Sequence, residues 1–154
     1  MCKKPCNIIE AVEFVSKYKN DAALLAKMYD LPTENILGLA AHESQYGGGR
    51  IAKDNNNFFS MHAPAPLQIG EDTARGNSKV KVARYNSFYQ CGQSFLLRFG
   101  AAVKGVHDPK AFGQALVKAR FNSRSSANGG RYGYASLVAD AIKMVKVRMT
   151  CGKP

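Results

Sequence analysis

The sequence predicts a mainly α fold with a small β-hairpin lobe, an α+β arrangement, formed by one domain over residues 1–154. Apolar residues recur at the three- and four-residue spacing of helices in about six segments. They alternate, as in strands, only over residues 67–69 and 80–82. Of the 154 residues 45% are hydrophobic, so the chain is long and apolar enough for one core. We find no repeat or linker that would divide it.

The N-terminal part predicts three helices in succession. Asn7 followed by Glu10 has the spacing of a capping box, and a first helix should follow to about residue 18. Asn20 or Asp21 should cap a second, short helix that continues to about residue 28. A third helix is expected over residues 34–45, because a run of three glycines stops it there.

The rest of the chain predicts an irregular segment, a hairpin and three more helices. Residues 50–66 lack periodicity, and the two alternating segments after them form the hairpin. Ser87 should open a long helix, and Asp108 with Pro109 has the pattern of an N-cap followed by proline at the first helical position. The last helix is expected over residues 134–145, after a polar loop.

The charge of the chain limits its partners. Lys and Arg number 22 against 11 Asp and Glu, which gives a formal net charge of +11. Such a chain meets polyanions, among them nucleic acid, anionic lipid and the bacterial wall. The basic residues are scattered without an RNA-recognition or helix-turn-helix signature, so nucleic acid is not an expected partner. No apolar run approaches the roughly 18 residues of a membrane span, so no membrane insertion is expected.

Four cysteines occur, and an even count in a small chain fits two disulfides. A direct Cys2–Cys6 bond would close a very short loop, so we expect each of these two to pair with one of Cys91 and Cys151. Four buried thiols are the alternative. The three histidines are scattered and no Cys-x-x-Cys pair occurs, so neither a metal site nor a cofactor is expected.

Glu43 is the candidate catalytic acid. It lies seven residues after Ile36 and three after Ala40, which places it on the apolar stripe of the third predicted helix. Burial disfavours the charged form of a carboxyl, and an acid that keeps its proton near neutral pH can protonate a leaving oxygen, as in glycosidases. The alternative is a solvated glutamate in the last helical turn.

At these residues the chain resembles glycoside hydrolase family 73. Ala40–Gly47 resembles the family's Ala-x-x-Glu-Ser-x-aromatic-Gly segment, Ile51–Met61 its Leu-Ala-x-x-x-Asn-Asn-Leu-Phe-Gly-Ile segment, and Ala83–Ser87 its Phe-Arg-x-Tyr-x-Ser segment. The resemblance covers roughly residues 30–148. It implies a lysozyme-like helical domain, a bacterial N-acetylglucosaminidase activity and Glu43 as general acid.

Two positions depart from the family's pattern. Ser60 stands where the family has glycine after Leu-Phe. Phe121 falls near the tyrosine of the family's Tyr-Ala-Thr-Asp segment, whose side chain lines the cleft. Tyr132 or Tyr134 could supply the missing hydroxyl, although a tyrosine at helical spacing is more often a core residue. We take Tyr132 as the substrate-binding candidate.

The second carboxylate is expected on the hairpin, where Glu71 and Asp72 are the acidic residues and Glu71 is favoured. Either carboxylate could activate a water molecule or stabilise an oxazolinium formed by the substrate's N-acetyl group. The alternative is that both side chains are surface charges that point into solvent. Tyr46 and Asn57 are the other substrate-binding candidates. Simple packing is the alternative for Tyr46, and bracing of a backbone turn for Asn57.

These observations predict a peptidoglycan hydrolase that cuts between N-acetylglucosamine and N-acetylmuramic acid. A lytic transglycosylase or muramidase of the same superfamily is one alternative, and a non-enzymatic basic module that binds nucleic acid or wall polymer is another. The basic start of the chain lacks the apolar stretch of a signal peptide. We therefore expect an antibacterial type VI secretion effector that acts in the periplasm or cell wall, rather than a phage lysin or a mature fragment. Its expected partners are glycan strands and an immunity protein that blocks the cleft.

Overall fold

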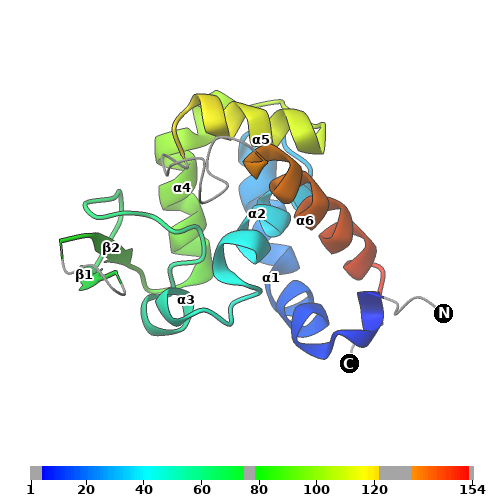
Figure 1. The fold of residues 1–154 in the computed structure, drawn as a ribbon, viewed down its shortest axis with the longest axis horizontal. Helices are drawn as coiled ribbons and strands as arrows, with labels where there is room; N and C mark the ends of the chain where they lie inside the picture. Colours follow the sequence, from blue (N-terminus) through cyan, green and yellow to red (C-terminus); the bar gives the residue numbers. More distant parts are fainter. Residues whose placement is uncertain (1–4, 75–78, 122–132, 153–154) are drawn as a thin grey trace.

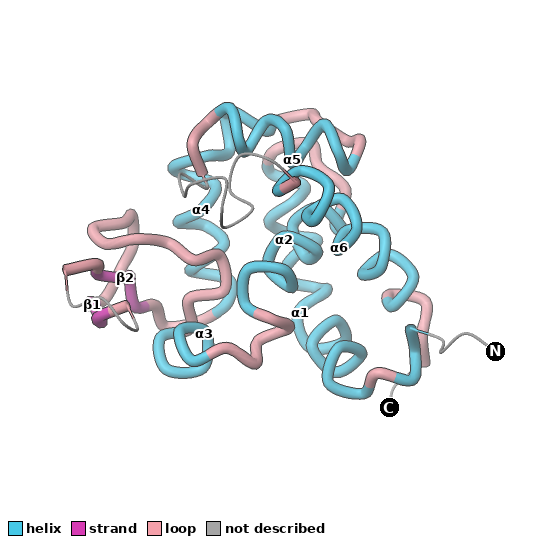
Figure 2. The backbone as a smooth tube through the Cα atoms, viewed as in Figure 1, coloured by secondary structure: helices cyan, strands magenta, loops and turns pink. Residues whose placement is uncertain are grey.

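A computed structural model describes residues 5–74, 79–121 and 133–152 (Figures 1 and 2). The elements in chain order are the 3-10 helix η1 (Pro5–Asn7), α1 (Ile9–Met28), α2 (Thr33–Ser44), α3 (Arg50–Asn55), β1 (Gly70–Thr73), β2 (Lys81–Arg84), α4 (Phe88–Val103), α5 (Pro109–Lys118) and α6 (Tyr134–Arg148). The predicted mainly α fold with a small hairpin is confirmed. Within these ranges no helix has the length and apolar character needed to cross a membrane.

Helix α1 corrects the prediction of two short N-terminal helices. It runs unbroken from Ile9 to Met28, and Asn20 and Asp21 lie inside it. The expected capping box is also wrong, because the N-cap is Ile8 and no side chain caps the helix. The buried residues continue past Asn20 to Ala26, and α1 packs on α2 and α4, so tertiary packing overrides the local capping signal.

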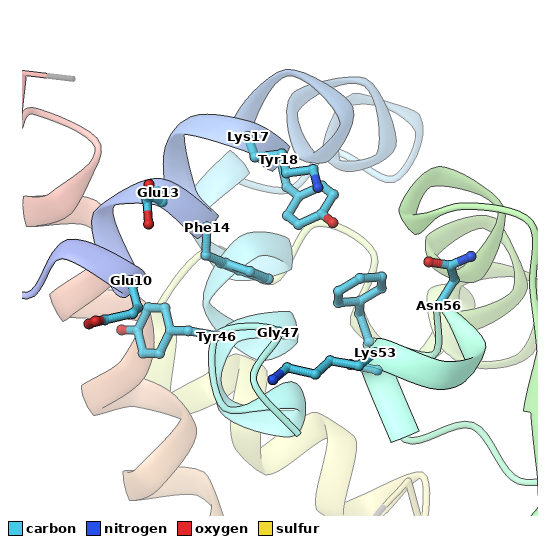
Figure 3. A pocket seen from close by; sticks show the side chains of 11 residues that line it. Glu10, Glu13, Phe14, Lys17, Tyr18, Tyr46, Gly47, Lys53 and Asn56 are labelled. Carbon is cyan, nitrogen blue, oxygen red and sulfur yellow. The ribbon is translucent and has the colours of Figure 1, made fainter. Parts of the chain in front are cut away.

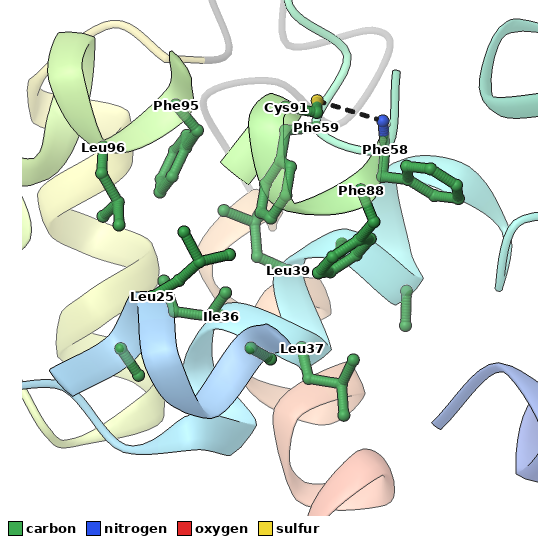
Figure 4. Packing of buried hydrophobic residues seen from close by; sticks show 14 of the residues in the cluster. Leu25, Ile36, Leu37, Leu39, Phe58, Phe59, Phe88, Cys91, Phe95 and Leu96 are labelled. Atoms are coloured by element: carbon green, nitrogen blue, oxygen red, sulfur yellow. Dashed lines mark hydrogen bonds between the residues drawn. The ribbon is translucent and has the colours of Figure 1, made fainter. Parts of the chain in front are cut away.

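Helix α2 forms the centre of the molecule, packed between α1 and α6 (Figure 1). Its side chains Ile36, Leu37 and Leu39 are fully buried in the core (Figure 4). Gly38 faces α6 so closely that a Cβ there would lie 2.6 Å from the Cα of Ile142. The position therefore requires glycine, and α2 and α6 form one rigid pair.

The end of α2 begins the segment that we predicted to be irregular. The helix ends at Ser44, and Gln45 and Tyr46 take left-handed backbone conformations with φ of 53° and 55°. Residues 50–66 are not wholly irregular, because Arg50–Asn55 form α3. Six residues are too few to display a helical period, which explains why the sequence pattern missed this helix.

The hairpin is confirmed, but the position of its first strand is corrected. Strand β1 (Gly70–Thr73) pairs antiparallel with β2, with Glu71 opposite Ala83. The alternating residues 67–69 precede the strand, since Leu67 adopts a left-handed φ of 64° that extended pairing does not allow. The predicted caps of the later helices are confirmed: Ser87 accepts from the backbone N–H of Gln90, and Asp108 from that of Ala111.

One disulfide joins Cys6 to Cys151, so η1 is bonded to the segment that follows α6. The expectation that Cys151 pairs with Cys2 or Cys6 is confirmed, whereas the expected disulfide at Cys91 is wrong. Cys91 is a free thiol in the core with an exposed fraction of 0%, and its sulfur accepts a hydrogen bond of 3.4 Å from the backbone N–H of Phe58 (Figure 4). Burial raises the pKa of this thiol to about 12. Cys2 lies outside the described residues.

Candidate active site

Glu43 lies in the last turn of α2 and is half-buried. Its Oε2 accepts a hydrogen bond of 2.5 Å from the hydroxyl of Tyr134, the first residue of α6. Tyr134 is only 2% exposed. Its burial, followed by the negative charge of Glu43 beside it, holds the pKa of the phenol far above its usual value. The hydroxyl therefore keeps its proton and acts as a donor to the carboxyl group.

Tyr134 was the less favoured of the two tyrosines that the sequence offered for this hydroxyl. Tyr132 lies outside the described residues, so its expected role stays a prediction. The Tyr134 ring lies 6.4 Å from the ring of Phe121 and 5.7 Å, edge-on, from the ring of His42. Tyr134 is thus both a core residue and a partner of Glu43. The phenylalanine at position 121 was the sequence signal that pointed to a tyrosine from elsewhere in the chain.

Ser44 fixes the backbone that follows Glu43. Its hydroxyl donates to the carbonyl of Ala40 at 2.6 Å and accepts from the N–H of Gly47 at 2.9 Å. The left-handed turn after α2 is therefore closed by a buried side chain. This arrangement holds the last turn of the helix in a single conformation.

Ser60 supports the same helix end from the other side. Its φ is 53°, so the position keeps the left-handed conformation for which the family uses glycine. Its hydroxyl donates to the backbone carbonyl of Glu43 at 3.4 Å. Serine at this position therefore adopts the left-handed turn and contacts the backbone of the catalytic candidate.

Tyr46 is tied to the C-terminal end of α6. Its hydroxyl accepts a hydrogen bond of 2.5 Å from Nη1 of Arg148, whose guanidinium carbon lies 5.0 Å from the ring centroid. The ring also packs edge-on against Phe14 at 5.7 Å. Nε of Arg148 donates to the carbonyl of Pro5 at 3.2 Å. These contacts order the tyrosine but leave its predicted sugar contact untested.

Asn57 is buried, with an exposed fraction of 2%. Its Nδ2 donates to the carbonyls of Met61 and Ala83, both at 2.9 Å, and its Oδ1 accepts from the N–H of Met61 at 2.9 Å. The amide thus closes the turn over residues 57–61 and ties that turn to β2. Of the two roles left open by the sequence, this geometry is that of bracing.

Asp72 is a structural carboxylate at the junction of α3 and β1. Its Oδ2 accepts from Nδ2 of Asn55 at 3.0 Å and from Nη1 of Arg50 at 3.1 Å, and its Oδ1 accepts from the N–H of Thr73 at 2.7 Å. These donors, Asn55 first, hold the pKa of Asp72 below its usual value. A carboxylate whose two oxygens already accept these hydrogen bonds is poorly placed to exchange protons with a substrate.

Glu71 is the adjacent residue on β1 and therefore projects to the other face of the hairpin. Its side chain is exposed, and its Oε2 accepts a hydrogen bond of 3.3 Å from Nε2 of Gln68. The carboxyl group is thus accessible and lightly held. Its catalytic role stays a prediction.

The described ranges contain no group of three or more His, Cys, Asp or Glu side chains that could hold a metal ion. Glu43 offers a carboxyl group for proton transfer, and one of its two oxygens accepts the hydrogen bond from Tyr134.

Known proteins resemble this chain in sequence and in structure. A sequence profile of the glucosaminidase family, described as mannosyl-glycoprotein endo-beta-N-acetylglucosaminidase, matches residues 19–146. No curated protein matched the chain in a sequence search. A type VI secretion system effector-immunity complex from Pseudomonas protegens contains a chain that is 53% identical, with a TM-score of 0.85; the match covers 96% of this chain and 99% of that one.

Two further structures are less similar. A peptidoglycan hydrolase variant from Sphingomonas sp. A1 is 25% identical with a TM-score of 0.71, over 90% of this chain and 95% of the other. A glycoside hydrolase domain from Salmonella typhimurium FlgJ, at 20% identity and a TM-score of 0.62 over 88% and 97% of the two chains, shares the fold. The profile match and the 53% identity confirm the resemblance found in the sequence. The chain belongs to the glucosaminidase family.

Proposed function

We propose that this chain hydrolyses the glycan backbone of peptidoglycan at the bond between N-acetylglucosamine and N-acetylmuramic acid, with residues 1–154 acting as one lysozyme-like domain. The observation that carries the proposal is the 2.5 Å hydrogen bond from Tyr134 to Glu43 at the end of the buried helix α2. Family membership and the similarity to a peptidoglycan hydrolase support the choice of substrate.

Glu43 is the proposed general acid. Protonated Glu43 gives its proton to the glycosidic oxygen while the bond from that oxygen to the anomeric carbon breaks. Because Oε2 accepts the bond from Tyr134, the transferable proton belongs on Oε1. The carboxylate left after transfer keeps the Tyr134 hydrogen bond, and a bond to a charged oxygen is stronger than one to a neutral oxygen. Tyr134 is therefore a positioning residue for this step.

Glu71 is the proposed second carboxylate. It takes the proton of the attacking water, or it stabilises the oxazolinium that forms when the N-acetyl oxygen attacks the anomeric carbon. Its exposure supports this role, whereas Asp72 is held by Arg50 and Asn55. Tyr46 and Tyr132 are proposed sugar contacts, and Asn57 contributes through the turn that it braces.

The test of this function is mass spectrometry of purified peptidoglycan digested by the parent protein and by Glu43→Gln. New reducing ends on N-acetylglucosamine, absent with the variant, are expected. Reducing muramic ends would identify a muramidase, and anhydro-muramic ends a lytic transglycosylase. A wall that remains uncut by the parent protein would overturn the enzymatic proposal.

The proposed setting is interbacterial: an antibacterial type VI effector that acts in the periplasm or wall of a rival. The 53% identity to a chain from an effector-immunity complex supports this setting. We propose an immunity protein that covers the surface around Glu43, and the net charge of +11 would speed association with an acidic partner. Expression with and without an added periplasmic signal tests the setting. We expect the chain to be toxic only when it carries the periplasmic signal. Co-expression of a neighbouring gene product should relieve this toxicity.

A further inference from the structure

A hollow lies between α1, the turn after α2, and α3 with the residues that follow it (Figure 3). Its volume is about 390 Å³, and Glu43 is not among the residues that line it. The buried rings of Phe14 and Phe58 form its apolar floor, and Tyr18 and Tyr46 form its walls. Tyr46, a proposed sugar contact, belongs to this hollow, whereas Glu43, Tyr134 and Glu71 do not line it.

Contacts within the chain hold the walls of the hollow in place. The Tyr18 ring stacks on Phe88 with centroids 4.4 Å apart and an interplanar angle of 16°. Nδ2 of Asn56 donates to the carbonyl of Tyr85 at 3.1 Å, which fixes the amide at the far end. Rigid walls lower the entropic cost of binding.

Charges of both signs stand at the rim of the hollow. Glu10 and Glu13 project from α1, while Lys53 extends from α3 on the opposite side (Figure 3). Across the described ranges, none of these three side chains forms an ion pair with another residue. Lys17 adds a second ammonium group, 5.3 Å from the Tyr18 ring centroid. A ligand would therefore meet the carboxylates of Glu10 and Glu13 with the ammonium group of Lys17 on the α1 side, and the ammonium group of Lys53 on the α3 side.

This pattern selects the chemistry of an occupant. A simple anion would be repelled by the two glutamates, and a simple cation by the two lysines. The pattern fits a zwitterion whose ammonium and carboxylate groups are separated by an apolar chain that lies over Phe14 and Phe58. A diamino acid within a short acidic peptide has this form.

We propose that this hollow binds the peptide stem of peptidoglycan through its diamino acid residue. The free amine lies at Glu10 and Glu13, and the carboxylate on the same carbon lies at Lys17. The second carboxylate lies at Lys53, and the methylene chain between the two ends covers the two phenylalanine rings. The inference rests on the proposed function, since that substrate carries such peptides on its glycan.

The position of the hollow links stem binding to the candidate acid. Tyr46 and Gly47 line the hollow, and Tyr46 follows Glu43 by three residues, a span of at most about 11 Å along the chain. A stem held here would keep the attached glycan strand close to the catalytic helix end. The chain would then favour peptide-bearing strands over stripped ones.

Binding is tested with the full parent chain, because the free peptide used as the probe has no glycosidic bond to be cut. The probe is the free tripeptide L-alanyl-γ-D-glutamyl-meso-diaminopimelate, titrated by calorimetry and by NMR. Saturable binding is expected, and Glu13→Gln or Lys53→Met should each weaken it about 5- to 10-fold. The matched changes Asp140→Asn and Lys19→Met, at exposed positions outside the hollow, should leave the affinity at the parent value. Absence of saturable binding, or equal affinities in all four variants, would overturn the inference.

A kinetic measurement distinguishes a failure of this inference from a failure of the proposed function. The ratio of kcat/KM for peptide-bearing over peptide-stripped glycan strands is measured with the parent protein and with Glu13→Gln. The ratio should exceed one in the parent and fall in the variant. Equal cutting of both substrates by the parent would overturn the inference and leave the hydrolase intact. Tripeptide binding without any cutting would overturn the hydrolase alone.

Discussion

The hydroxyl of Tyr134 donates a hydrogen bond of 2.5 Å to Oε2 of Glu43, although 91 positions separate the two residues in the sequence. The bond joins the first residue of α6 to the last turn of α2. Because these two helices pack along their length, the bond is set by the core and not by a mobile surface contact. The candidate acid is therefore positioned by the same packing that stabilises the fold.

Glu43→Gln should reduce the hydrolysis of purified peptidoglycan by a factor on the order of 10² or more. The amide has nearly the same shape but carries no transferable proton. Release of soluble muropeptides, followed by chromatography, measures the loss, and circular dichroism should show an unchanged fold. Activity near the parent level would remove Glu43 from the mechanism.

Tyr134→Phe should lower kcat by roughly 10- to 100-fold while the ring keeps its place in the core. The carboxylate of Glu43 would lose a hydrogen bond to its charged form, so kcat should fall while KM stays near the parent value. Tyr89→Phe, on a half-buried tyrosine of α4, is the matched control and should change neither kcat nor KM. A kcat at the parent value in a folded Tyr134→Phe protein would contradict the positioning role.

Glu71→Gln and Asp72→Asn should separate catalysis from stability. We expect a partial loss of activity for Glu71→Gln with an unchanged thermal midpoint, because its carboxyl is exposed. Asp72→Asn should lower the thermal midpoint, since the charged oxygens that Arg50 and Asn55 hold are lost. If Asp72→Asn instead abolished activity in a fully stable protein, the hairpin acid would be Asp72.

The stabilising effect of Asp72 should also depend on pH. Its folded-state pKa lies below the usual 3.8, so its charged form is favoured by folding. The stability that it contributes is present above the unfolded pKa and is lost as pH falls through the folded pKa. Thermal midpoints of the parent and Asp72→Asn, measured from pH 7 downward, should therefore converge in acid. A constant gap across that range would contradict the assignment.

The disulfide and the free thiol should behave differently on labelling. Cys91 should resist thiol reagents in the folded protein and react after unfolding, because it is fully buried and its pKa is raised to about 12. Cys151→Ser should lower stability by up to about 5 kcal/mol, the chain-entropy limit for a bridge across 145 positions. Mass spectrometry of labelled peptides and denaturant titrations measure the two effects. Rapid labelling of Cys91 in folded protein would contradict its place in the core.

The sequence predicted the features that are fixed by local chemistry. Ser87 and Asp108 cap their helices because an N-cap needs only a side-chain oxygen and the next turn of backbone. The same kind of signal failed at Asn20, where an apolar face that spans the whole of α1 outweighs one polar residue. The hairpin was found, but the left-handed backbone of Leu67, which lies outside the strand, leaves no trace in an alternating pattern.

The site was predicted less completely than the fold. Glu43 could be selected because its helix spacing is visible in the sequence. Tyr134 could be named but not preferred, because its contact with Glu43 depends on how α6 packs on α2. The even number of cysteines suggested two disulfides. That number does not show which cysteines are buried in the core, and Cys91 proved to be a core thiol.

The bond between Cys6 and Cys151 also determines how the molecule responds to a pulling force. A load applied to the chain outside these two residues passes through the sulfur–sulfur bond and does not reach the helices between them. A motor that threads polypeptide through a narrow pore would meet a covalent ring and would have to admit two strands side by side or wait for reduction. The oxidised protein is therefore suited to being carried whole, whereas the reduced chain is the form that such a motor could thread.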